Sequence, residues 1–169
     1  NGAWADAALK AQLGKCALSA QDAALCSRIV YGVMQNELLL NWYLSTYCTQ
    51  KLDHLQPPLS DILRIGAYQI LFLDKIPVSA AVNEAVEQTK TYANKRAAGL
   101  VNGSLRTLAR RKGELEQPHD LATKYSHPQP LVDCLRASMD EETLEVFLAA
   151  DNDIPKTAMQ VNTLKAAPE

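Results

Sequence analysis

The sequence lacks the features of a membrane-spanning or secreted protein. No apolar run reaches the roughly 18 residues that a bilayer-spanning helix needs. The densest apolar stretch, residues 62–73, is interrupted by Arg64 and Gln69. The opening Asn1-Gly-Ala-Trp4 has neither the basic start nor the following apolar segment of a signal peptide. We therefore expect a cytoplasmic protein with no membrane partner.

Patterns of metal ligands, nucleophiles and phosphate-binding loops are also missing. The sequence contains no GxGxxG, Walker or GxSxG motif, so no cofactor loop or nucleophile elbow is predicted. The cysteines are Cys16, Cys26, Cys48 and Cys134, and the histidines are His54, His119 and His127. No cysteine pair has CxxC spacing, and no histidine is spaced from another ligand as zinc sites require. We predict no metal site and no catalytic residue, and we expect buried, reduced thiols of a cytosolic protein.

Acidic residues are absent from residues 90–112, which carry seven basic side chains. The net charge of the chain is −2, so the remainder sums to −9. A short cationic segment on an otherwise acidic protein indicates local contact with a polyanion.

Apolar residues recur at helical spacing along most of the chain, which predicts an all-α bundle over residues 1–115. Ser19 and Ser60 are expected to cap helices, and Pro77 begins another with Ser79 as a candidate cap. The helix that ends near residue 73 is apolar almost all round, which places it at the bundle centre.

The remainder of the chain has a different pattern. Residues 116–129 are expected to be a linker, and two short helices follow near 130–138 and 140–150. Residues 157–164 look extended, and a single strand has no partner for its backbone groups. We therefore expect residues 130–169 to be the truncated start of a small α+β domain.

The last bundle helix, predicted over residues 95–111, carries the cationic face. On a helical wheel Arg96, Arg106 and Arg110 fall within about 80° of one another, with Gly99 and Gly103 between them. This face lies opposite much of the apolar stripe, and glycines beneath arginines leave the backbone open to a phosphate chain. The candidate RNA-binding residues are Lys95, Arg96, Arg106, Arg110, Arg111 and Lys112.

Structural alternatives exist for these residues. Cations in the last helical turn stabilise the helix dipole without any ligand, and the two glycines could allow another helix to pack closely. Arg64 is interpreted as an edge charge or as a partner of Asp61 or Glu84. Asn83 and Asn102 are interpreted as internal hydrogen-bond partners.

Several motifs together resemble the NusB-like domain of the Sun family of ribosomal RNA cytosine methyltransferases. They are Ile29-Val-Tyr-Gly32, Leu63-Arg-Ile-Gly-Ala-Tyr-Gln-Ile70, Ala81-Val-Asn-Glu-Ala-Val86, Arg96-Ala-Ala-Gly-Leu-Val-Asn102, Tyr125-Ser-His-Pro-Gln129 and Val161-Asn-Thr-Leu-Lys165. The resemblance implies an RNA-binding domain of an enzyme that forms 5-methylcytosine in small-subunit rRNA with S-adenosylmethionine. The implied partners are that RNA and the protein's own C-terminal methyltransferase domain.

Two departures limit what the resemblance implies. The family usually opens with a helix of Arg-x-x-Ala-Leu type, which is not found here, so one side of the bundle is expected to be uncovered. No cysteine lies in the family's catalytic Pro-Cys motif, and no glycine-rich loop for the methyl donor is present. No cofactor is therefore expected in this chain itself. Free-standing NusB antitermination factors share the helical part, and a protein-interaction scaffold is the other alternative.

Overall fold

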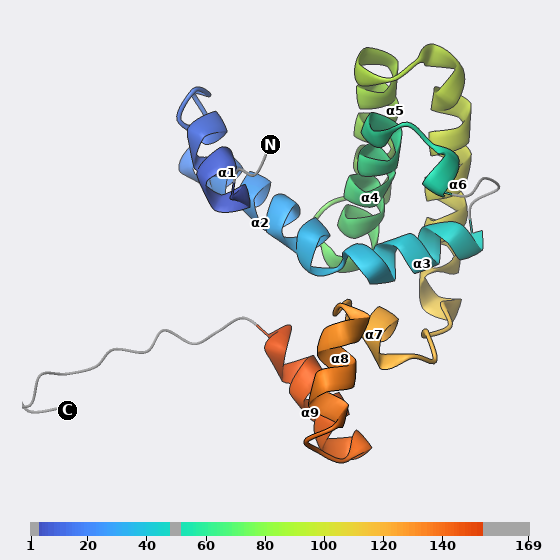
Figure 1. Ribbon diagram of the computed structural model, residues 1–169. Helices are drawn as coiled ribbons and strands as arrows, with labels where there is room; N and C mark the ends of the chain where they lie inside the picture. The colour runs from blue at the N-terminus through green and yellow to red at the C-terminus, as the bar shows by residue number, and fades with distance from the viewer. Residues whose placement is uncertain (1–3, 48–51, 154–169) are drawn as a thin grey trace, which may run out of the picture.

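A computed structural model describes residues 4–47 and 52–153, and the regular structure in these ranges is helical (Figure 1). The longer helices are α1 (Ala5–Leu13), α2 (Ala20–Gln35), α3 (Glu37–Tyr47), α4 (Pro57–Phe72), α5 (Val78–Tyr92), α6 (Ala98–Arg111), α8 (Gln129–Arg136) and α9 (Glu141–Asp151). Shorter turns are η1 (Leu52–His54), η2 (Lys95–Ala97), η3 (Lys112–Glu114) and α7 (Leu121–Lys124). The predicted all-α fold is confirmed.

Helix α4 is the centre of the bundle, as its apolar sequence predicts. It packs against α2, α3, α5 and α6. Leu63 and Ala67 on this helix are fully buried, and Leu105 of α6 is fully buried beside them in the same core. Figure 1 shows α4, α5 and α6 standing side by side while α3 crosses their lower end.

The helix starts follow local capping chemistry. Ser19 caps α2, because its hydroxyl oxygen accepts a hydrogen bond from the amide of Asp22. The expected cap at Ser60 is wrong, since α4 begins at Pro57. Proline is favoured in the first helical turn because its missing N–H would have no intrahelical partner there. Ser79 is likewise not a cap, because Pro77 occupies that position.

One side of the bundle is sparsely covered within the described ranges. Helix α1 has no buried residue, and Gly32 is the buried residue of α2. A groove between α2, α4 and α5 is lined by apolar side chains that include Leu18, Leu25, Ile29 and Ile65. No helix in the described part is both long and apolar enough to cross a membrane.

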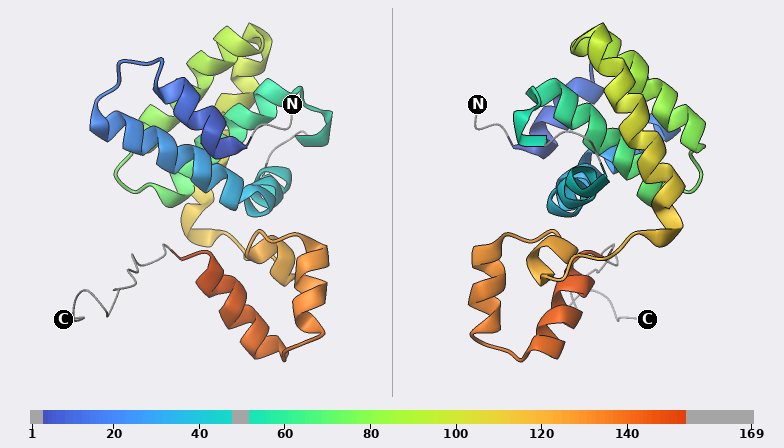
Figure 2. Two further views of the ribbon diagram at one scale, coloured as in Figure 1. Left: turned by 60° about the vertical axis from the view of Figure 1, so that its left-hand side comes forward. Right: turned by 90° about the vertical axis from the view of Figure 1, so that its right-hand side faces the viewer.

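A second, smaller apolar cluster lies in α7–α9, formed by Ala122, Val132, Leu144 and Leu148. The two views of Figure 2 place these helices beside the lower end of the bundle, where α7 contacts α3. Helices α8 and α9 match the two expected short helices, and α7 lies within the stretch expected to be a linker. The expected strand at 157–164 lies outside the described residues.

The structure changes the interpretation of the cysteines. Cys16 and Cys134 are exposed and Cys26 is half-buried, so the expectation of buried thiols is wrong for Cys16 and Cys134. Cys16 lies in the turn that follows α1, and Cys134 lies on the exposed side of α8. Cys48 lies outside the described residues.

The two asparagines and Arg64 also have defined environments. Asn83 is exposed, so its interpretation as an internal partner is wrong, and Asn102 is half-buried. Arg64 binds Asp61 as expected, at 2.8 Å, but its other partners are Glu37 and Asn41 of α3. Glu84 is not among its partners, because the guanidinium extends toward α3.

Candidate nucleic-acid interface

The cationic face begins with a tighter turn than the wheel assumed. Residues Lys95–Ala97 form the 3-10 turn η2, which Asn94 caps by accepting a hydrogen bond from the amide of Ala97 at 2.9 Å. Arg96 therefore precedes the regular helix α6, whereas Arg106 and Arg110 lie on it one turn apart. All three arginines are exposed.

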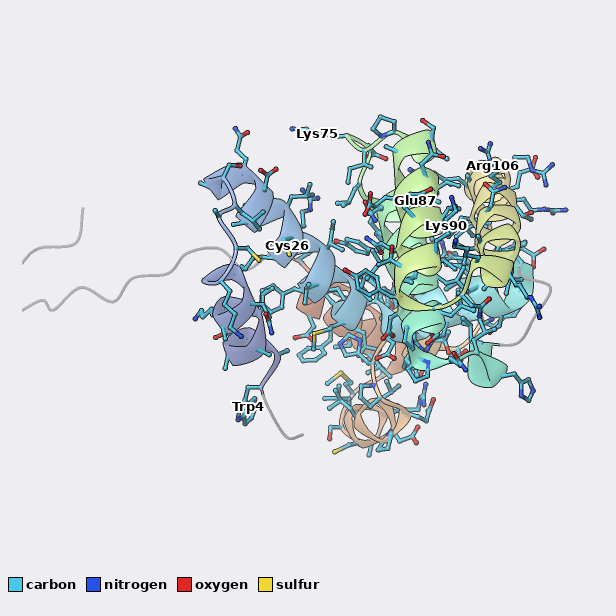
Figure 3. All side chains as sticks on the ribbon, turned by 90° about the horizontal axis from the view of Figure 1, so that it is seen from above. Trp4, Cys26, Lys75, Glu87, Lys90 and Arg106 are labelled. Carbon is cyan, nitrogen blue, oxygen red and sulfur yellow. The ribbon has the colours of Figure 1, made fainter. Side chains whose placement is uncertain are left out.

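The opposite face of α6 anchors the helix in the core. Its buried residues are Val101, Ser104, Leu105 and Leu108. Because this stripe is fixed against α3, α4 and α5, the arginine side of α6 is held toward solvent. Figure 3 shows Arg106 on α6 and Lys90 on the neighbouring α5.

Gly99 and Gly103 lie on the exposed side of α6, and neither supports the packing of another helix in the described part of the molecule. A Cβ placed on either residue would meet no atom within 4 Å. The contrast is Gly66 of α4, where a Cβ would lie 2.5 Å from Leu105 Cδ1. The two exposed glycines therefore form a bare strip of backbone that an extended ligand can approach closely.

The arginines beside this strip have only weak local partners. Arg106 Nε donates to Asn102 Oδ1 at 2.9 Å, and Arg110 donates to Thr107 Oγ1 at 3.4 Å. Within residues 4–47 and 52–153, neither of these arginines nor Arg96 forms a salt bridge. Their guanidinium charges are thus available for an external anion.

Two other candidate residues are already engaged with the bundle. The guanidinium carbon of Arg111 lies 5.8 Å from the ring centroid of Tyr47, which is a cation–π contact. Lys112 Nζ lies 2.9 Å from Asp74 Oδ1. The structure therefore separates Arg111 and Lys112 from the arginines on the open face, a division that the sequence did not reveal.

Shallow hollows flank the glycine strip on both sides. One is lined by Tyr47, Gly99, Leu100, Gly103, Ser104 and Thr107. The other is lined by Val78, Gly103, Arg106, Thr107, Ala109 and Arg110. Tyr47 and Val78 escaped the sequence analysis because α3 and α5 bring them to α6 only in the folded chain. The alternation of glycines and arginines was the signal that could be read directly.

Comparison with known proteins supports the family resemblance. The model of the NusB family matches residues 1–110. A probable ribosomal RNA small subunit methyltransferase B of Bacillus subtilis is 34% identical over 171 residues, which cover 98% of this chain and 38% of that protein. The corresponding protein of Synechocystis is 30% identical, with 97% and 38% covered.

A different relative matches a smaller share of the chain. The transcription antitermination protein NusB of Bacillus licheniformis is 36% identical over 102 residues, which cover 59% of this chain and 77% of that protein. The similarity to the methyltransferases continues through α7–α9, although the chain spans only 38% of the length of those two relatives. The NusB family model matches more than half of this chain, so the chain belongs to the NusB family.

Proposed function

We propose that this chain holds ribosomal RNA for a methyltransferase. The observation that carries the proposal is the open face of α6, where Arg106 and Arg110 flank the bare backbone at Gly103. Arg96 extends the positive charge at the start of the helix. Guanidinium groups can bind phosphate oxygens in pairs, and the missing Cβ atoms permit close contact with a sugar-phosphate chain.

Charge distribution supports a specific location for the RNA. The seven cations of residues 90–112 belong to a chain whose remaining residues sum to −9. A phosphate chain is attracted to this one region and repelled by most of the surface. Lys95 reinforces the open face, whereas Arg111 and Lys112 contribute to the field from positions already bound to Tyr47 and Asp74.

The family relationship suggests where the chemistry takes place. We place it in a part of the protein beyond this chain, which would methylate small-subunit rRNA at cytosine with S-adenosylmethionine in the cytoplasm. The chain itself carries no glycine-rich loop suited to that methyl donor, and we assign it no step of the reaction. Residues 1–115 would bind RNA, 116–129 would link, and 130–169 would lead into the next domain.

A salt titration tests the proposal. Fluorescence anisotropy with a structured small-subunit rRNA fragment should give an affinity that falls steeply as salt rises. The double variant Arg106→Ala/Arg110→Ala should weaken binding by roughly tenfold or more. It should also reduce the slope of log K against log salt by about 0.7–0.9 for each phosphate that the variant no longer neutralises. Helicity by circular dichroism should stay unchanged because both side chains are exposed.

A matched control removes two other cations. Lys15 and Arg28 are both exposed, and they lie before and within α2, away from the arginine face of α6. The variant Lys15→Ala/Arg28→Ala has the same net charge as the test variant and should retain most of the affinity. Equal reductions in affinity for the two double variants would contradict a localised RNA site.

One observation favours a second function. Arg111 and Lys112 already contact groups of the bundle, so a part of the cationic segment is structural, and the open arginines could meet acidic residues of a protein. In that scaffold function, RNA binding would be absent or independent of salt in the titration above.

A further inference from the structure

The motif Tyr125-Ser-His-Pro-Gln129 plays no part in the proposed RNA site, yet it forms an unusual turn between α7 and α8. Ser126 has a φ of 58°, the one positive φ of a non-glycine residue in the described ranges. His127 is buried, with 7% of its surface exposed. A strained residue next to a buried polar one persists only where the surroundings hold both in place.

Both ring nitrogens of His127 face oxygen atoms. Nδ1 lies 2.7 Å from the carbonyl oxygen of Tyr125, and Nε2 lies 3.0 Å from Asp151 Oδ2 at the end of α9. Both separations are within hydrogen-bond distance, so the ring of His127 ties the turn to the end of α9.

The other charged groups on these elements are largely engaged with one another. Lys124 of α7 pairs with Glu145 of α9, and the hydroxyl of Tyr125 also donates to Glu145. Glu37 at the start of α3 lies 3.6 Å from Arg64. Asp153, just beyond α9, adds a further negative charge near the end that carries Asp151. Lys124 and Arg64 are thus occupied elsewhere, and Asp151 keeps its contact with His127.

The same turn also binds the bundle. The amide of Leu38, in the first turn of α3, donates to Ser126 Oγ at 3.0 Å. Gln35 Nε2 at the end of α2 donates to the carbonyl oxygen of Asn152 at 3.0 Å and to its Oδ1 at 3.1 Å. Asn152 in turn donates to the carbonyl oxygen of Tyr125 at 2.7 Å.

We infer that residues 125–127, Asp151 and Asn152 form a clasp that fixes α7–α9 in one orientation against α2 and α3. His127 is the positioning residue of the clasp, because it joins the turn to the end of α9. These two segments in turn contact α3 and α2. The clasp contacts the bundle at two points: Ser126 contacts α3, and Asn152 contacts α2. Without it, the packing of α7 on α3 is the main remaining attachment of α7–α9 to the bundle.

The clasp also affects where bound RNA lies relative to the end of α9, an inference that rests on the proposed function. The RNA face belongs to α6 of the bundle, whereas the chain continues from α9 at the clasp. A fixed clasp therefore sets the direction from bound RNA to residue 153, just beyond the end of α9. A loose one would leave RNA binding intact but remove that alignment.

Residual dipolar couplings of backbone amides test the clasp in the 169-residue chain. One alignment tensor should fit α4–α6 and α8–α9 together. In His127→Phe, which fills the space without donors, and in the double variant of half-buried Ser126 and exposed Gln35, Ser126→Ala/Gln35→Ala, the two groups should need different tensors. The Leu38 amide should also exchange with solvent about fivefold faster or more, since its acceptor is removed or displaced.

The matched control is His119→Phe, at the exposed histidine of the same connecting segment; it should keep the single tensor. A single tensor that persists in both His127→Phe and Ser126→Ala/Gln35→Ala would overturn the inference. Because no clasp residue lies on the arginine face, RNA affinity should stay within about twofold of the parent in every clasp variant. If only the arginine variants lose RNA binding, that result concerns the proposed function and does not bear on the clasp.

Discussion

At the scale of single residues, the glycines divide into two kinds that the sequence alone does not separate. Gly32 and Gly66 are buried where a Cβ would collide with Tyr68 and Leu105, at 2.0 Å and 2.5 Å respectively. Gly99 and Gly103 face open space within the described part. Helix packing requires glycine at Gly32 and Gly66. Gly99 and Gly103 lower helix stability without a packing benefit.

Gly66→Ala should destabilise the bundle. The added methyl group must displace Leu105, a fully buried core residue, so we expect a decrease of about 1–3 kcal/mol in the free energy of unfolding. Urea denaturation monitored by circular dichroism measures this decrease. An unchanged midpoint would show that α4 and α6 can move apart at no cost.

Gly99→Ala/Gly103→Ala should have opposite effects on stability and binding. Each substitution should stabilise α6 by roughly up to 1 kcal/mol because alanine is the better helix former. RNA affinity should nevertheless fall several-fold, since the new methyl groups stand between the backbone and a phosphate chain. Denaturation and anisotropy on the same samples separate the two effects, and unchanged affinity would mean that RNA does not approach this strip.

At the scale of elements, α9 shows how a helix start depends on one carboxylate. Asp140 Oδ1 accepts from the backbone amide of Thr143 at 2.9 Å, and Oδ2 accepts from its hydroxyl at 3.0 Å. These two hydrogen bonds, the backbone one first, lower the pKa of Asp140 below its ordinary value of 3.8.

The sign of the pH effect follows from that lowered pKa. The cap is fully present above the ordinary pKa of aspartate, and it disappears as the pH falls from there through the lower folded pKa. The Thr143 amide proton shift, followed by nuclear magnetic resonance, should therefore move only in strong acid. Asp140→Asn, which can cap without a charge, should not show this transition; a transition shared by both proteins would have another origin.

Most elements were predictable from sequence because local chemistry decides them. The periodic apolar residues fixed the helices, and Ser19 was recognisable as a cap. The start of α4 was misplaced because Pro57 can replace a side-chain cap at a helix start. The cations and glycines of α6 were readable in the same way. The partners of Arg111 and Lys112 were not, because Tyr47 and Asp74 approach them only through the crossing of distant elements.

At the scale of the whole molecule, the chain holds two apolar clusters of very different size. The bundle core draws on α3–α6, whereas the cluster of α7–α9 rests on Ala122, Val132, Leu144 and Leu148. Local stability follows the apolar surface that each part buries. The small cluster should therefore open well before the bundle does.

Leu148→Ala and Leu63→Ala test this division, since both leucines are fully buried. Each truncation should cost its own cluster about 2–5 kcal/mol. Because the small cluster has little to spare, Leu148→Ala should remove hydrogen-exchange protection from α7–α9 while α4–α6 stay protected and RNA still binds. Leu63→Ala should lower protection of the bundle and weaken RNA binding with it, because the arginines of α6 are then poorly supported. Equal reduction of hydrogen-exchange protection in both clusters after either substitution would mean that the chain unfolds as one cooperative unit. The bundle and α7–α9 would then be held together strongly enough to couple two unequal cores.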